Sequence, residues 1–88
     1  MSTLTDLPNV GKVLAQNLRA VGIDTPEQLR ELGTQEAFRR IRAIDPGACI
    51  QMLYGLHGAV LGIRDRDLPA EAKLELRQFI DGLNGIKK

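Results

Sequence analysis

The sequence has few of the residues on which catalytic, metal-binding and disulfide-rich proteins depend. It contains one cysteine, Cys49, and one histidine, His57, in 88 residues. A single cysteine excludes an intramolecular disulfide and a cysteine-based zinc cluster. The histidine has no neighbouring serine, cysteine or carboxylate at the spacing of a catalytic or metal-ligating set. We therefore expect no enzyme activity, no metal, no cofactor and no small-molecule substrate.

Aromatic residues are also scarce, and tryptophan is absent. Phe38, Tyr54 and Phe79 are the whole aromatic set. A core must therefore be built from Leu, Ile, Val and Ala, and the 43% hydrophobic content is sufficient for one domain of this length. Because strands favour β-branched and aromatic residues, this composition favours helices. The sequence predicts a single all-α domain over residues 1–88.

No hydrophobic run is long enough to cross a membrane. The most apolar stretch, residues 48–63, contains Gln51, His57 and three glycines, and it is shorter than the ~20 residues that a membrane span needs. The first six residues lack the basic segment and apolar run of a signal peptide. With a single cysteine, these features predict a cytoplasmic protein that makes no membrane contact.

Neither sign of charge is in excess. Twelve Lys and Arg residues oppose eleven Asp and Glu residues, which gives a formal charge of +1. A domain that binds nucleic acid over its whole surface usually has a larger basic excess. A local phosphate site remains compatible with this charge, and we expect any such binding to be weak.

Signals for helix starts and stops recur along the chain. Thr25-Pro26-Glu27-Gln28 combines a Thr cap, a proline at the first helical position and a Gln that closes a capping box. Thr34 and Asp45 offer further caps, and Gly22 and Gly33 are suited to positive φ after a helix end. These signals predict a compact five-helix domain with helices at 11–21, 26–32, 35–44, 46–62 and 69–83.

The fourth predicted helix is apolar nearly all round and is expected to lie buried at the centre. We interpret Cys49 as a small core residue and His57 as a structural side chain. A stripe of small residues on this helix would let another helix approach closely, from the same chain or from a second copy. The stripe consists of Ala48, Gly55, Ala59 and Gly62.

The clearest functional hint is the segment Leu7-Pro8-Asn9-Val10-Gly11-Lys12. Pro8 sets a turn, Asn9 tolerates the left-handed conformation of a tight hairpin, and Gly11 lets the backbone bend. The first amides of the helix that follows have no acceptor within the helix. Because the helix dipole and Lys12 lie beside them, these amides form a site suited to phosphate.

This segment resembles the helix-hairpin-helix DNA-binding element, in which a Gly-hydrophobic-Gly hairpin holds a backbone phosphate. Here Asn9 stands in place of the first glycine, and at most one helical turn precedes Leu7. A faint internal repeat indicates a second hairpin of the same design. It matches Leu7, Val10, Gly11 and Ala15 with Leu29, Leu32, Gly33 and Ala37.

Arg39, Arg40 and Arg42 form the densest basic cluster, on the third predicted helix. They could add Coulomb attraction to a DNA backbone held at the hairpin. The alternative is an ordinary solvated helix face, partly paired with Glu36 and Asp45. We interpret residues 64–67, Arg-Asp-Arg-Asp, as a solvated loop.

Segments spread over nearly the whole chain resemble the C-terminal domain of the TfoX/Sxy family. They are residues 7–11, 21–30, 43–49, 56–59 and 68–69. The resemblance implies an all-helical domain with a helix-hairpin-helix-like start. It also implies a relation to bacterial competence and to the regulation of DNA-uptake genes. Family members commonly carry an α/β domain before this one, and a role for such a domain in trans stays open.

Two functions from different classes follow. In the first, the chain is a non-enzymatic regulatory module in which the amides of Val10, Gly11 and Lys12 hold a phosphate of double-stranded DNA. Such contacts fix position but read no sequence. In the second, the hairpin or the small-residue stripe docks a protein partner or a second copy, without DNA. Salt discriminates between them, because phosphate contacts weaken steeply as salt rises.

Overall fold

The computed structural model describes residues 3–85, and within this range the chain forms helices and turns but no strand. The predicted all-α class and the five helices are confirmed. Two short 3₁₀ turns accompany the helices. The elements are η1 (Leu4–Asp6), α1 (Lys12–Ala20), α2 (Pro26–Leu32), α3 (Thr34–Ile44), α4 (Ile50–Leu61), η2 (Asp65–Asp67) and α5 (Ala70–Leu83).

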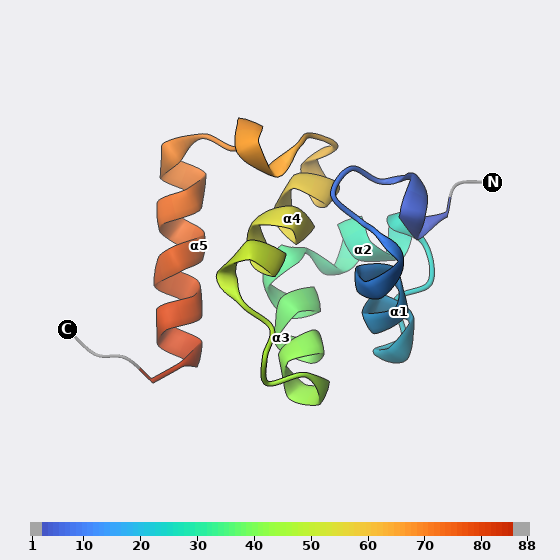
Figure 1. The fold of residues 1–88 in the computed structure, drawn as a ribbon, viewed down its shortest axis with the longest axis horizontal. Coiled ribbons are helices and arrows are strands. Elements are labelled where there is room, and N and C mark those ends of the chain that lie inside the picture. The colour runs from blue at the N-terminus through green and yellow to red at the C-terminus, as the bar shows by residue number, and fades with distance from the viewer. Residues whose placement is uncertain (1–2, 86–88) are drawn as a thin grey trace.

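Helix α4 lies at the centre, as its apolar sequence predicts. It packs against α2, α3, α5 and η2, and Leu53, Leu56 and Ala59 are fully buried. Figure 1 shows α5 on one side of the α3–α4 pair and the η1–α1 segment on the other. None of the helices in residues 3–85 has the length and apolar character of a membrane span.

The core is aliphatic, as the shortage of aromatic residues requires. Leu18, Leu29 and Ile41 are fully buried together with Phe38. The Phe38 ring meets the edge of Phe79 with the ring centroids 6.4 Å apart, an arrangement that aromatic pairs favour. This contact joins α3 to α5.

The predicted capping box at the start of α2 is confirmed. The Thr25 hydroxyl accepts the Gln28 N–H at 3.1 Å, and the Gln28 side chain accepts the Thr25 N–H at 3.2 Å. Gly22 and Gly33 adopt φ values of 88° and 90°, as predicted. Gly33 alone connects α2 to α3, so these two helices form a tight pair.

Two predicted helix starts are wrong. Helix α4 begins at Ile50 instead of residue 46, because the Asp45 carboxylate accepts the Gly47 N–H at 3.0 Å and turns the chain there. Thr34 does not cap α3 but is its first residue, and Gly33 takes the cap position. The Thr34 hydroxyl lies 2.8 Å from Nδ1 of His57 instead, which gives this histidine a structural contact between α3 and α4.

Cys49, which was expected in the core, lies on the surface, and so does the apolar Val13. Cys49 is exposed, because it occupies the cap position before α4 and not the interior of that helix. Val13 is 68% exposed, although the next residue, Leu14, is buried. It lies in the first turn of α1, next to the loop that carries the functional hint.

Candidate nucleic-acid interface

The loop 7–11 connects η1 to α1 through a tight turn. Leu7 and Val10 are buried on either side of it, and the Val10 N–H donates to the Leu7 carbonyl at 3.4 Å. Asn9 adopts φ 67°, the left-handed conformation predicted for it. The element before the loop is a three-residue 3₁₀ turn, shorter than the leading helix of a full helix-hairpin-helix.

The side chain of Asn9 points inward, toward the end of α4. Its Nδ2 donates to the carbonyls of Gly55 at 3.3 Å and Ile63 at 2.9 Å. Its Oδ1 accepts the Asp65 N–H at 3.2 Å. With these three bonds the side chain joins the loop 7–11 to α4 and to the segment that follows it. The expected place of Asn9 in a phosphate site stays a prediction.

The small residues of α4 allow this close approach. A Cβ added to Gly58 would lie 2.5 Å from Nδ2 of Asn9 and 2.7 Å from the Ile63 carbonyl oxygen, and one added to Gly55 would meet the Asn9 side chain at 3.4 Å. Gly55, one member of the predicted stripe, therefore receives a loop of the same chain, and so does Gly58, which the prediction did not include. Ala48, Gly55 and Ala59 are buried within the chain.

Gly11 precedes α1 and is exposed. Its φ of −92° is open to any residue, and an added Cβ would meet nothing within 4 Å. Neither the turn nor the packing of the chain requires glycine here. The absence of a side chain does leave the start of α1 accessible to a partner backbone.

The first turn of α1 has no side-chain cap. Its leading amides therefore lack partners within the helix. Of the three amides predicted to hold phosphate, that of Val10 donates to Leu7, whereas those of Gly11 and Lys12 lie at the open end of α1. Lys12 is the first residue of α1, and its side chain is exposed.

A shallow hollow of about 610 Å³ lies beside the loop. Residues 5–11 form most of its wall, and Arg64 also lines it. Arg64 is exposed, and it stands here because Asn9 holds the following residue, Asp65. Asp6 also lines the hollow, but one of its carboxylate oxygens accepts the Thr3 N–H at 2.9 Å.

Arg64 is the residue that sequence reasoning missed. Residues 64–67 alternate in charge and were interpreted as a solvated loop. Arg64 is brought to the hairpin by bonds from Asn9 to residues more than 40 positions away. No local pattern in the sequence signals such bonds.

The arginines of α3 turn to other partners. Arg39 and Arg40 both pair with Glu36, at 3.3 and 3.2 Å, and Arg39 also lies 5.7 Å from the centre of the Phe79 ring. Arg42 donates to the side chain of Asn84 at the end of α5. Arg39 and Arg42 therefore face α5, on the other side of the α3–α4 pair from the loop 7–11 (Figure 1).

The internal repeat extends to packing but not to the turn. Ala15 and Ala37 are both fully buried, and Leu7 and Leu29 are both core residues. Gly33 has a φ of 90°, whereas its counterpart Gly11 has −92°. The left-handed residue of the first loop is Asn9 instead.

Comparison with known proteins gives one consistent family. Residues 1–80 match the model of the TfoX C-terminal domain. Protein Sxy of Escherichia coli K12 is 35% identical over 80 residues, which are 91% of this chain and 38% of Sxy. The chain thus spans well under half the length of that relative.

Two crystal structures from Listeria monocytogenes have the same fold. One, described as an uncharacterized protein in a triclinic form, has a TM-score of 0.97 and 45% identity over 99% of both chains. The other, a protein of unknown function in a tetragonal form, has a TM-score of 0.88 and 47% identity over 90% of this chain and 98% of that one. By its match over residues 1–80, this chain belongs to the TfoX C-terminal domain family.

Proposed function

We propose that this chain is a non-enzymatic regulatory binding module that contacts the nucleic-acid backbone through the loop 7–11 and Arg64. The observation that carries the proposal is the setting of Gly11. This glycine is not needed by the fold, yet it lies between the uncapped start of α1 and a hollow lined by Arg64. Open amides, a missing side chain and a cation suit a phosphate group.

Each residue has a separate role in this proposal. The amides of Gly11 and Lys12 donate to a phosphate oxygen, and the cations of Lys12 and Arg64 supply Coulomb attraction. Asn9 is a positioning residue, because its side chain is engaged by α4 and residues 63–65. Since these contacts address phosphate, they position the module without reading sequence.

The arginines of α3 have a secondary place in the proposal. Arg39 and Arg40 share Glu36, so their net contribution to the local charge is reduced. They add a diffuse positive potential and not a direct contact. Family membership supports the regulatory part, because the TfoX/Sxy family is associated with competence and the control of DNA-uptake genes.

The experiment is a titration of ¹⁵N-labelled protein with a short mixed-sequence duplex, at low and at moderate salt. We expect salt-sensitive shifts of the amides of residues 10–13 and 63–65. Gly11→Glu places a carboxylate among the phosphate donors and abolishes the shifts, whereas Gly11→Ala retains them. Both variants fold, because the space around Gly11 is open.

A charge-matched pair of variants tests Arg64. Arg64→Gln removes the cation that lines the hollow, and Arg66→Gln removes a neighbouring exposed cation that does not line it. We expect about a fivefold to tenfold loss of affinity for the first, the value of one charge-assisted contact, and a much smaller loss for the second. Absence of shifts at low salt, or equal losses in both variants, contradicts the proposal.

A second candidate function is docking of a protein partner at the same end of the domain. It is favoured by Val13, which is 68% exposed beside the loop. Apolar docking would be insensitive to salt and would be lost in Val13→Ser. A duplex titration without effect, together with concentration-dependent sedimentation that Val13→Ser removes, would select self-association instead.

A further inference from the structure

A second hollow, of about 310 Å³, lies where α3 ends, α4 begins and α5 ends. Arg42 and Arg77 line it with Cys49 and Ile50 at the start of α4, and α5 adds Asp81 and Asn84. We propose that this hollow binds the phosphate group of a small anionic ligand through the two guanidinium groups. It is separate from the loop 7–11 and does not depend on the function proposed there.

Arg42 supplies the first observation. Its Nη2 donates to the Asn84 side chain, whereas its Nη1 is buried and has no hydrogen-bond partner within residues 3–85. A buried charged donor without an acceptor is unfavourable. A guanidinium carries five donors in a planar fork that matches the oxygens of a phosphate. Nη1 is closed to solvent while Asn84 is in place, and a phosphate that replaces the exposed Asn84 side chain would bring it the missing acceptor.

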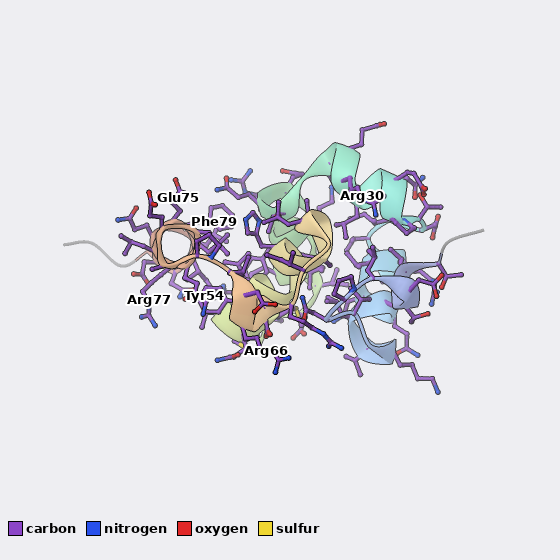
Figure 2. The ribbon with its side chains drawn as sticks, turned by 90° about the horizontal axis from the view of Figure 1, so that it is seen from above. Arg30, Tyr54, Arg66, Glu75, Arg77 and Phe79 are labelled. Atoms are coloured by element: carbon purple, nitrogen blue, oxygen red, sulfur yellow. The ribbon has the colours of Figure 1, made fainter. Side chains whose placement is uncertain are left out.

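Arg77 and the start of α4 supply the second observation. Arg77 comes from α5 and is exposed, and Figure 2 shows it on the opposite side of α5 from Glu75. Helix α4 has no side-chain cap at Cys49, so the amides of its first turn are open to an anion. Cations from two helices and the start of a third therefore meet at one hollow.

Two residues in the hollow oppose binding, and they make the proposal testable. Asn84 holds Arg42 through a neutral oxygen, which is a weaker acceptor for a guanidinium than a phosphate oxygen. A bound phosphate would therefore displace Asn84. Within residues 3–85 no arginine pairs with Asp81 at salt-bridge distance. Its negative charge is therefore not neutralised by a direct partner and repels the ligand.

The test is a titration of ¹⁵N-labelled protein with inorganic phosphate, against sodium chloride at matched ionic strength. We expect saturable shifts at residues 48–50 with phosphate alone. Arg77→Gln weakens binding by about tenfold, the value of one charge-assisted contact. Arg30→Gln, which removes an exposed cation on α2 far from α5 (Figure 2), leaves it unchanged.

Two further variants should strengthen phosphate binding instead of weakening it. Asn84→Ala frees Arg42, and Asp81→Asn removes the repelling charge, so each tightens binding several-fold. A purely structural role of these residues would not strengthen phosphate binding. Gly11→Glu leaves the response unchanged, which separates this site from the loop 7–11.

Glycerol 1-phosphate in a second arm distinguishes the sources of the group. Tighter binding of the ester assigns the hollow to a phosphorylated metabolite-sized ligand, and tighter binding of inorganic phosphate assigns it to the free ion. Shifts equal to those with chloride, or a response that survives Arg77→Gln, overturn the proposal. Weaker binding of phosphate to the Asn84→Ala variant also overturns the proposal.

Discussion

Asn9 holds the loop 7–11 against the end of α4 through three hydrogen bonds. Its left-handed backbone could be predicted from the sequence, because asparagine after proline in a short turn is typical of that conformation. Its side-chain contacts could not, because Gly55, Ile63 and Asp65 are far away in the chain. The position of Arg64 depends on these same contacts and was missed for the same reason.

Substitutions of Asn9 separate the contribution of its side-chain hydrogen bonds from that of its left-handed backbone. Asn9→Ala loses the three hydrogen bonds. It also places alanine at φ 67°, a left-handed conformation that alanine adopts less readily than asparagine. We expect it to lower the free energy of unfolding by about 2–4 kcal/mol, from lost bonds and strain together. Asn9→Gly also loses the hydrogen bonds, but glycine adopts this backbone conformation without strain. It should therefore be about 1 kcal/mol more stable than Asn9→Ala. Urea denaturation measures both, and equal stability of Asn9→Ala and the parent would contradict this account.

Two helical glycines should respond to alanine with opposite signs. Gly58→Ala drives a methyl group to 2.5 Å from Nδ2 of Asn9 in the loop 7–11 and to 2.7 Å from the Ile63 carbonyl oxygen, so we expect a loss of about 1–3 kcal/mol from overpacking. Gly82 lies in α5 with nothing within 4 Å of an added Cβ, so Gly82→Ala should gain about 0.5–1 kcal/mol. Thermal unfolding of the two variants compares them directly. A neutral result for Gly58→Ala would mean that the loop does not pack on α4.

Among the secondary-structure elements, the features that depend on neighbouring residues could be predicted from the sequence. The capping box of α2 and the positive φ of Gly22 and Gly33 involve neighbours within a few residues, and both were predicted. The start of α4 was not, because Asp45 before Pro46 has two local options, a helix cap or a turn closed on Gly47. The structure has the turn, which places Cys49 on the surface.

The capping box gives a prediction for α2. Thr25→Ala removes the acceptor of the Gln28 N–H and should lower the free energy of unfolding by about 1 kcal/mol. Thr25→Ser keeps the hydroxyl and should retain most of the stability. Chemical denaturation of both variants tests this, and equal losses would assign the effect to the lost methyl group instead of the cap.

At the scale of the whole molecule, the central α4 separates two surfaces. The loop 7–11 with Arg64 lies on one side, and α5 with Arg39 and Arg42 lies on the other (Figure 1). The all-α class, the five helices and the buried fourth helix follow from composition and periodicity. The grouping of basic residues depends on how the helices pack, so no local pattern in the sequence shows that Arg39 and Arg42 face α5.

The salt dependence of duplex affinity, followed by fluorescence anisotropy of a labelled duplex, tests whether the loop 7–11 binds phosphate. If the loop contacts one or two phosphates, the logarithm of the association constant should fall with the logarithm of the salt concentration with a slope of about −1 to −2. Gly11→Glu should remove this binding. A slope near zero, or an unchanged affinity in Gly11→Glu, would contradict the assignment of the loop 7–11 as a phosphate-binding element.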